Sequence, residues 1–426
     1  MTTTARAVVA AGSGALLVAL VALASTGTVG AVTSLVLAAG LLALVWLGPD
    51  RFGQALVLAG VFTAPMNSVR PIAGADAATF SDLFLFLGFA LLVPRMLSGR
   101  ARVSALHLAA SLMLVCVGAV SSLLNANTAT SFFYLVKMMT GLILLPLAFQ
   151  VWRPSAERLR WLVWAYVLGQ LVSLLDGVAG SRVGGRFLGL TTHPNFFGIC
   201  SMLAAALCLY LISTAPVGRR VWPVLACGGC LLSVVLSGSR AALLATVVIA
   251  IVFPVLERSA RAGYLVVAAG TLAGASAGLL LDRLGPDSAI GRLAGEGTSQ
   301  GSDAARMENL TSAWHTFLQN PLGGTGFQVD TAFAHNGYLE VATAFGILGA
   351  VAYGLLLWSM VRTILRNERR NLLGYAALGY AFVSFFNNTL WDRFAWVALS
   401  LVLVADQVVA RPPQVDQPRR LEDVPA

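Results

Sequence analysis

The chain has 426 residues, of which 58% are hydrophobic and 11% are charged, and its mean hydropathy is +0.80. Soluble domains carry about a quarter charged residues, so this composition excludes an ordinary soluble protein and indicates a membrane protein of many helices. The formal net charge of +9 does not call for a nucleic-acid partner, because most arginines fall in connections between apolar segments.

Apolar runs follow one another along the chain, and each is a candidate membrane span. They cover residues 7–25, 29–47, 52–66, 80–97, 103–124, 128–150, 160–178, 195–213, 221–237, 241–256, 264–281, 335–361, 371–389 and 394–410. The runs 52–66 and 241–256 are shorter than the roughly 20 residues that cross a bilayer comfortably. We therefore predict an all-α fold, a polytopic transmembrane helical bundle of about 12–14 spans that forms one membrane domain over residues 1–426.

The five cysteines all lie within these apolar runs, so no disulfide framework is predicted. Cys227 and Cys230 have the spacing of a redox motif. Close packing of small residues inside a span is nevertheless the favoured interpretation of this pair.

Arginines occupy alternate connections between the runs. These are Arg95, Arg100 and Arg102; Arg153, Arg158 and Arg160; Arg219 and Arg220; Arg258 and Arg261; and Arg362, Arg366, Arg369 and Arg370. The positive-inside rule predicts that these connections and both termini, including the tail 411–426, are cytoplasmic. The segments 181–195 and 282–334 are then extracytoplasmic, and the second is a larger loop that contains short helices and an amphipathic helix.

Further arginines lie on the opposite side, where orientation does not require them. For Arg70, Arg182, Arg283, Arg292 and Arg393 the favoured interpretation is solvation or lipid-headgroup anchoring. Arg186, Arg240 and Arg306 lie in motif-like contexts, namely GGRFLGLTTHPNFFG, LSGSRAALLA and SDAARMENLTSAW. A guanidinium group suits a pyrophosphate, because its planar fork donates two hydrogen bonds and it stays charged when desolvated. The sole lysine, Lys137, is either snorkelling or paired, and no role is predicted for it.

The loop before the run 195–213 contains two further polar candidates. Asn195 is expected to cap the helix of that run, whose amino end favours an anion. His193 is expected to be structural, with a supporting role in the site as the alternative. The glycines of this loop give it a flexible backbone.

The stretch 302–350 contains the densest set of polar and ionisable residues in the chain. We predict a helix capped by Ser302 or Asp303 and ended by Asn320-Pro321, because apolar residues recur at helical spacing between these points. A second helix, the span 335–361, is predicted to begin near His335. A base and a fixed cation at a membrane surface are suited to a substrate that bears phosphate.

His335 stands out from the other histidines, because Asn336 and Glu340 crowd around it at the start of a span. From the residues alone, catalytic and structural interpretations of His335 remain equally open. Glu340 lies five positions further on and faces another side of an ideal helix, so it is a weaker candidate for orienting the imidazole. No metal site and no nucleotide fingerprint is present in the sequence, so no cofactor is predicted.

Three segments together resemble the O-antigen ligase and O-antigen polymerase family of bacterial membrane glycosyltransferases. They are SGSRAALLA, the segment that runs from Arg306 to NPLGGTGF, and HNGYLEVATAFGILGAV, within roughly residues 180–360. The resemblance implies a multi-pass protein of the cytoplasmic (inner) membrane whose active site lies on the outer face. It also implies an undecaprenyl-pyrophosphate-linked glycan as donor, a glycan or lipid-glycan acceptor, membrane lipids around the protein, and neither metal nor nucleotide sugar.

The same resemblance implies roles for individual residues. Arg240 and Arg306 match pyrophosphate-binding arginines, Arg186 matches a further arginine of that kind, and His335 matches the catalytic histidine. We expect His335 to take the proton from the acceptor hydroxyl during a single, inverting displacement at the anomeric carbon. Asn336, Glu340, His193 and Asn195 are supporting candidates.

Two other function classes remain as alternatives. The first is a polytopic transporter, since some similar proteins are labelled bicarbonate transporters. A transporter would place polar residues at the membrane midplane, whereas the ionisable groups here gather at one surface. A non-catalytic protein of envelope assembly would not need His335. Ligase and polymerase are not distinguished by the sequence.

Overall fold

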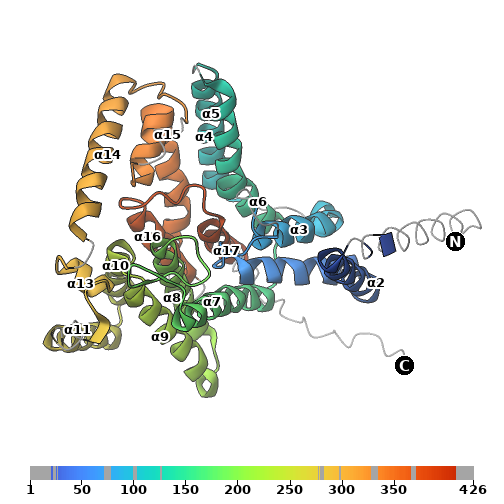
Figure 1. The fold of residues 1–426 in the computed structure, drawn as a ribbon, viewed down its shortest axis with the longest axis horizontal. Coiled ribbons are helices and arrows are strands. Elements are labelled where there is room, and N and C mark those ends of the chain that lie inside the picture. The colour runs from blue at the N-terminus through green and yellow to red at the C-terminus, as the bar shows by residue number, and fades with distance from the viewer. Residues whose placement is uncertain are drawn as a thin grey trace, which may run out of the picture.

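The computed structural model describes residues 21–408, apart from 23–24, 26, 72–77, 99–102, 125–126, 277, 279–282, 297–298, 328–333 and 366–370. This part of the chain is almost entirely helical (Figure 1). The all-α polytopic bundle expected from the sequence is confirmed. The tail 411–426, predicted to be cytoplasmic, and most of the run 7–25 lie outside the described residues.

The helices follow the predicted apolar runs closely. In the first half they are α2 (Thr28–Thr63), α3 (Phe80–Ser98), α4 (Ala105–Leu123), α5 (Thr128–Met139), η1 (Thr140–Leu144), α6 (Leu145–Trp152), α7 (Ala156–Ala179) and α8 (Pro194–Thr214). In the second half they are η2 (Val217–Arg219), α9 (Val221–Leu236), α10 (Arg240–Leu256), α11 (Ala260–Ala275), α13 (Ala289–Leu293), α14 (Ser299–Gln319), α15 (Gly337–Val361), η4 (Arg362–Leu365), η5 (Asn371–Leu373), α16 (Gly374–Val383) and α17 (Arg393–Val408). The strands β1 (Arg182–Val183) and β2 (Arg186–Phe187) form an antiparallel hairpin between α7 and α8.

Within the described residues, eight helices are long and apolar enough to cross a membrane. Three shorter apolar helices, Arg240–Leu256, Asn371–Val383 and Arg393–Ala405, accompany them. The protein is therefore a multi-pass membrane protein, although fewer helices reach spanning length than the predicted 12–14.

The runs 29–47 and 52–66 both lie in α2, and a break in that helix separates them. At Gly48 φ is 75° and ψ is 161°, which is not helical, and Pro49 follows. Positive φ is accessible to glycine without a steric penalty, and proline removes a backbone donor, so the two residues interrupt the helix between the two predicted runs.

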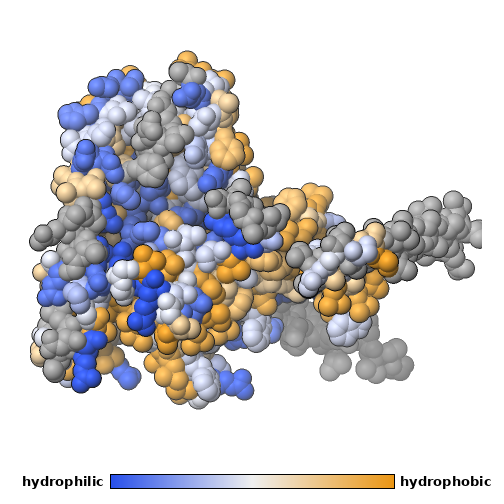
Figure 2. All heavy atoms as spheres, in the orientation of Figure 1, coloured by the Kyte–Doolittle hydropathy of each residue, from blue (hydrophilic) through white to orange (hydrophobic). Residues whose placement is uncertain are grey.

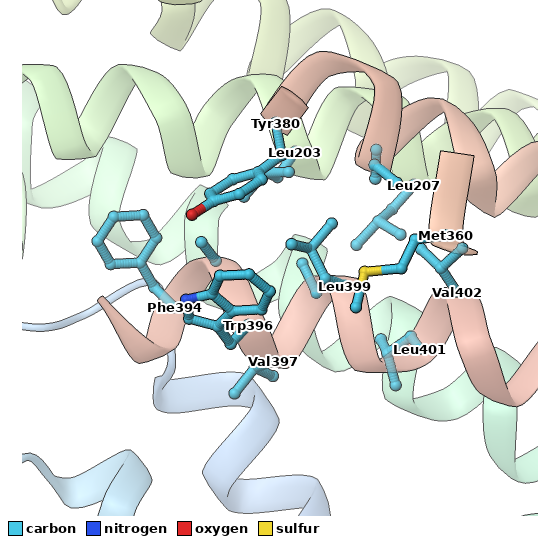
Figure 3. Packing of buried hydrophobic residues seen from close by; sticks show 14 of the residues in the cluster. Leu203, Leu207, Met360, Tyr380, Phe394, Trp396, Val397, Leu399, Leu401 and Val402 are labelled. Atoms are coloured by element: carbon cyan, nitrogen blue, oxygen red, sulfur yellow. The ribbon is translucent and has the colours of Figure 1, made fainter. Parts of the chain in front are cut away.

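Helix α8 lies at the centre of the bundle and α2 at its rim. In the most apolar part of each helix, 78% of the residues of α8 are buried inside the protein, against 6% of those of α2. Helices α7, α9, α10, α16 and α17 all pack on α8. Figure 3 shows the resulting core, in which Trp396 of α17 packs against Tyr380 of α16, with ring centroids 5.2 Å apart. Trp396 Nε1 donates to the Leu390 carbonyl at 3.1 Å, so its one polar atom is satisfied in this apolar setting.

The outside of the molecule divides by polarity. In Figure 2 hydrophobic residues cover much of α2 and α3, as expected for helices that face lipid. Hydrophilic residues gather between the upright helices α14 and α15 and the helices below them (Figures 1 and 2). The polar face of the protein is therefore the one that carries α14.

A glycine-rich turn fastens α14 to α15. Helix α15 breaks at Gly346 (φ 69°), and there the Ile347 amide donates to the Pro321 carbonyl at 2.8 Å. On the other side of the break, the Gly326 amide donates to the Ala344 carbonyl at 2.8 Å. A Cβ on Gly346 would come within 2.3 Å of the Leu322 carbonyl oxygen, so no other residue fits this approach. The turn after α14 thus holds that helix beside the start of α15.

Candidate active site

A pocket of about 360 Å³ opens on the polar face, between α10, α14 and the start of α15. Its lining comprises Arg240, Ala241, Leu244, Leu293, Asp303, Arg306, Met307, Leu310, Ala334, His335, Phe385 and Phe386. Arg240, Arg306 and His335, which are far apart in the sequence, therefore line one cavity. Arg186, His193, Asn195, Asn336 and Glu340 do not line it.

The turn Ser237–Arg240 presents Arg240 to the pocket. Ser239 caps α10 through its hydroxyl, which accepts a hydrogen bond from the Ala242 amide, so Arg240 is the first residue of the helix. Gly238 has a φ of 65°, and a Cβ there would lie 2.4 Å from the Asp287 carbonyl oxygen. Glycine is required at this position both for its conformation and for space.

Two arginines support this turn from behind. Arg186 donates from Nε to the Ser237 carbonyl at 3.0 Å and from Nη2 to Asn195 Oδ1 at 2.6 Å. Arg292, which is 3% exposed, donates from Nη1 to the Gly238 carbonyl at 2.8 Å. Arg186 thus has bonding partners within the protein, and its contribution to the pocket is through the turn and through its charge.

Arg240 is paired with a carboxylate that the sequence analysis assigned to capping. Helix α14 begins at Ser299, earlier than predicted, so Asp303 lies inside it and cannot be its cap. Both guanidinium Nη atoms of Arg240 bind the Asp303 carboxylate, with Nη1 to Oδ2 at 2.8 Å. The Asp303 side chain is 48% exposed, so water screens the pair and its net strength is small. An anion in the pocket can therefore compete with Asp303 for Arg240.

His335 lies two residues before α15, close to where the sequence predicts that helix to begin. The helix starts at Gly337, and the Oδ1 atom of Asn336 caps it by accepting from the Leu339 amide at 3.0 Å. His335 has a φ of 51°, a left-handed conformation that is unusual and mildly unfavourable for a residue with a side chain. The short turn before the cap therefore directs the imidazole into the pocket.

Burial, and then the charge of Arg306, lower the pKa of His335 from its ordinary value of 6.5. Its imidazole is consequently neutral at pH 7 and can accept a proton. His335 is half-buried and lines the pocket, so its ring can meet a ligand bound there.

Positive charge is concentrated around the pocket. Arg186, Arg240, Arg292 and Arg306 lie within electrostatic reach of one another, and Asp287 and Asp303 are the carboxylates among them. The balance is two positive charges. Burial, and then the neighbouring guanidinium groups, lower the pKa of Arg186 to about 10, and burial followed by Arg240 lowers the pKa of Arg306. The guanidinium groups repel one another, and an anion bound among them would relieve this repulsion.

The remaining candidates have structural positions. The cap of α8 is His193, whose Nδ1 accepts from the Asn195 amide at 3.1 Å, and Asn195 is therefore not the cap as predicted. Burial, and then Arg186, lower the pKa of His193 to about 4, so its ring is neutral. Glu340 is 2% exposed and lies in the first turn of α15, away from the pocket lining.

Sequence reasoning missed two members of the cluster, Asp303 and Arg292. The signal for Asp303 was its position three residues before Arg306, which puts both side chains on one helix face. Arg292 belongs to a short helix of five residues with no periodicity to indicate burial. Among the described residues, no group of three or more His, Cys, Asp or Glu side chains could hold a metal ion.

Comparison with known proteins supports this picture. Residues 225–354 match a family model described as O-antigen ligase, which confirms the resemblance inferred from the sequence. The matched range runs from α9 into α15 and includes Arg240, Arg306 and His335, whereas Arg186 and His193 precede it. No curated protein matches the chain.

Proposed function

We propose that the O-antigen ligase segment of this chain transfers a glycan from undecaprenyl pyrophosphate to an acceptor hydroxyl, as a metal-independent, inverting glycosyltransferase. The observation that carries the proposal is that two arginines and a neutral histidine, from three separate segments, line one pocket on the polar face. The family match over residues 225–354 supports a membrane enzyme of the glycosyltransferase type with lipid-linked glycan substrates.

The donor's diphosphate is assigned to Arg240 and Arg306. Guanidinium forks bind phosphate oxygens in pairs and stabilise the negative charge that develops as the diphosphate departs. The two positive charges left over in the cluster match the charge of such a group. Arg186 and Arg292 add to this field and keep the turn before α10 in place.

An apolar groove beside the pocket suits the polyprenyl tail. It has a volume of about 580 Å³ and is lined by side chains of α14 and α15, including Trp314, Phe317 and Tyr338. Leu310 lines both the groove and the pocket, so the two are adjacent. A lipid tail in this groove would leave its phosphates at Arg306, on the same helix.

His335 is assigned the role of general base. Its neutral imidazole would accept the acceptor's hydroxyl proton as the oxygen attacks the anomeric carbon. The bond from that carbon to the diphosphate oxygen breaks in the same step, and the released diphosphate keeps the electron pair. Because the displacement is single, the anomeric configuration inverts.

A transporter or a non-catalytic envelope assembly protein would not need this base. To distinguish a glycosyltransferase from these two classes, reconstituted protein would be incubated with lipid-linked glycan, and the release of undecaprenyl pyrophosphate would be measured together with glycan transfer. Transport of a solute without either product would favour the transporter. The number of repeats joined would distinguish a ligase, which transfers a chain once, from a polymerase.

We also propose that the pocket faces the outside of the cytoplasmic membrane, with both termini inside. The basic connections motivate this orientation. With native cysteines replaced by serine, Glu308→Cys on α14 should react with a membrane-impermeant maleimide on intact cells. Arg220→Cys, between α8 and α9, should react only after permeabilisation; both positions are exposed. The reverse labelling pattern would contradict the orientation and the mechanism.

Turnover should not depend on a divalent metal. The described residues contain no cluster of ligands, and arginines occupy the place where a metal would neutralise the diphosphate. Purified protein treated with EDTA should retain full transfer activity, measured as product formed per minute. Loss of activity in EDTA that is restored by Mg²⁺ or Mn²⁺ would refute this part of the proposal.

A further inference from the structure

A second charged pocket lies on the polar face, away from the pocket of His335. It has a volume of about 150 Å³, and its charged lining consists of Arg70, Lys137, Asp392 and Arg393. We call it the Lys137 pocket. Thr192 lines it as well, and the Thr192 amide donates to Asn67 Oδ1 at 2.9 Å, which joins the α7–α8 connection to the end of α2. His193, which follows directly, is within electrostatic reach of His335, so the Lys137 pocket lies on the side of the protein that carries the candidate active site.

Lys137 is the feature of this pocket that the proposed reaction does not use. It is the only lysine of the chain, and it lies in the apolar helix α5, where a cation is costly. Arg70, Asp82, Asp392 and Arg393 are all within electrostatic reach of it. No salt bridge to Lys137 is present in the described part of the chain. Of the two carboxylates that act on it, Asp82 is bound by Arg393, whose Nε donates to Asp82 Oδ1 at 2.8 Å.

The charge of this cluster is positive. Arg70, Lys137 and Arg393 face two carboxylates, Asp82 and Asp392, and burial raises the pKa of Asp392 to about 7. The cluster therefore keeps at least one excess positive charge near neutral pH, which suits an anionic phosphate headgroup.

An apolar groove begins at the Lys137 pocket. It has a volume of about 520 Å³ and lies between α3 and the helix formed by η1 and α6, with Leu85, Phe89, Val93 and Met96 on one wall. Arg393 lines both the groove and the Lys137 pocket, so the polar and apolar cavities meet at its side chain. The opposite wall includes Thr140 and Leu144 of η1, a π-helical turn that widens the helix at this level.

The length of the groove corresponds to one leaflet of a bilayer. From Leu85 to Met96 a helix rises roughly 16 Å, at about 1.5 Å per residue. Half of the hydrocarbon core of a membrane is about 15 Å thick. An acyl chain can therefore lie along α3 while its headgroup remains at the Lys137 pocket.

We propose that the Lys137 pocket and the α3 groove together bind one anionic phospholipid of the membrane. The phosphodiester is held by Lys137 with Arg70 and Arg393, and one acyl chain lies along α3. This site is separate from the donor site and does not depend on the proposed glycosyl transfer.

The test is native mass spectrometry of the full-length protein, released from detergent that contains equal amounts of phosphatidylglycerol and phosphatidylcholine with identical acyl chains. The wild type should retain one phosphatidylglycerol in at least tenfold preference, because phosphatidylcholine has no net charge to offer the cluster. Lys137→Met keeps the length of the side chain without its charge and should abolish the preference. Arg95→Gln, at the other end of α3, is the matched control and should keep it.

A second variant, Ala90→Trp, keeps the proposal testable if Lys137→Met does not fold. Ala90→Trp fills the middle of the groove from α3 and leaves every charge in place, so it should also prevent retention of the lipid. Equal retention of both lipids by the wild type would overturn the proposal, as would an unchanged preference in both variants. Displacement of phosphatidylglycerol by an equimolar amount of undecaprenyl pyrophosphate would also overturn it, by showing that the site takes a lipid-linked substrate.

Discussion

Replacing His335 by alanine is expected to lower turnover by about 10²–10⁴-fold, the contribution typical of a general base. The variant should bind the lipid-linked donor nearly as the wild type does, because Arg240 and Arg306 remain in the pocket. Turnover would be measured as undecaprenyl pyrophosphate released by reconstituted protein, and donor binding would be measured separately. His315→Ala on α14 is a matched control, since His315 is exposed and does not line the pocket.

The pH profile gives a second measure of the same assignment. A base whose pKa is lowered stays unprotonated to a lower pH, so wild-type turnover should persist below pH 6.5 and fall only as His335 becomes protonated. In Arg306→Gln the loss of the neighbouring charge should move this fall to higher pH. Near-normal turnover in His335→Ala, or a profile that Arg306→Gln leaves unmoved, would contradict the role of His335 as the base.

Replacing Arg306 or Arg240 by alanine is expected to weaken donor binding and to lower turnover by about 10²–10³-fold, as for the loss of a donor that stabilises developing charge. Lysine should not restore either function, because its ammonium group lacks the planar fork that binds two phosphate oxygens. Arg306 is the more sensitive position, since Arg240 is shared with Asp303. Donor binding and turnover can both be measured as described for the His335 variant.

Arg283→Ala is the control for the arginine series, because this side chain is exposed in the same connection between α11 and α14 and does not line the pocket. It should behave as the wild type. Wild-type behaviour of both lysine variants would mean that the arginines act only through charge, and the assignment of a bidentate diphosphate site would be wrong.

Much of the fold follows from the sequence, because apolar runs of spanning length have few alternatives to a helix in a membrane. The predicted end of α14 at Asn320-Pro321 agrees with the structure, since α14 ends at Gln319. Its predicted start does not, because several polar residues before Asp303 can also begin a helix. The boundary between the runs 29–47 and 52–66 was predictable, since Gly48-Pro49 has the composition of a connection and Gly48 is the non-helical residue that interrupts α2.

The sequence predicted which residues belong to the candidate site. It did not predict how their side chains are arranged or which partners they bind. Arg240 and His335 lie at the starts of apolar runs. Because the start of a spanning run lies at a membrane surface, the sequence alone predicts their depth in the membrane. Which partner each side chain takes depends on how the helices pack, and no local pattern records this. Arg186 illustrates the limit, because its hydrogen bonds to Ser237 and Asn195 come from segments on either side of α8 and α9.

The break in α15 at Gly346 has a consequence for recognising proteins of this kind. The segments NPLGGTGF and FGILG, on which part of the resemblance rests, form a joint where the backbone of the turn after α14 packs against the backbone of α15. A Cβ on Gly324 or on Gly346 would lie 2.3 Å from a backbone carbonyl oxygen of the other segment. None of these residues lines the pocket. A search guided by this joint therefore finds proteins that hold a helix beside the start of a span in this manner. Whether such a protein can perform the reaction must be judged from the few side chains that the joint supports, above all from those at positions 306 and 335.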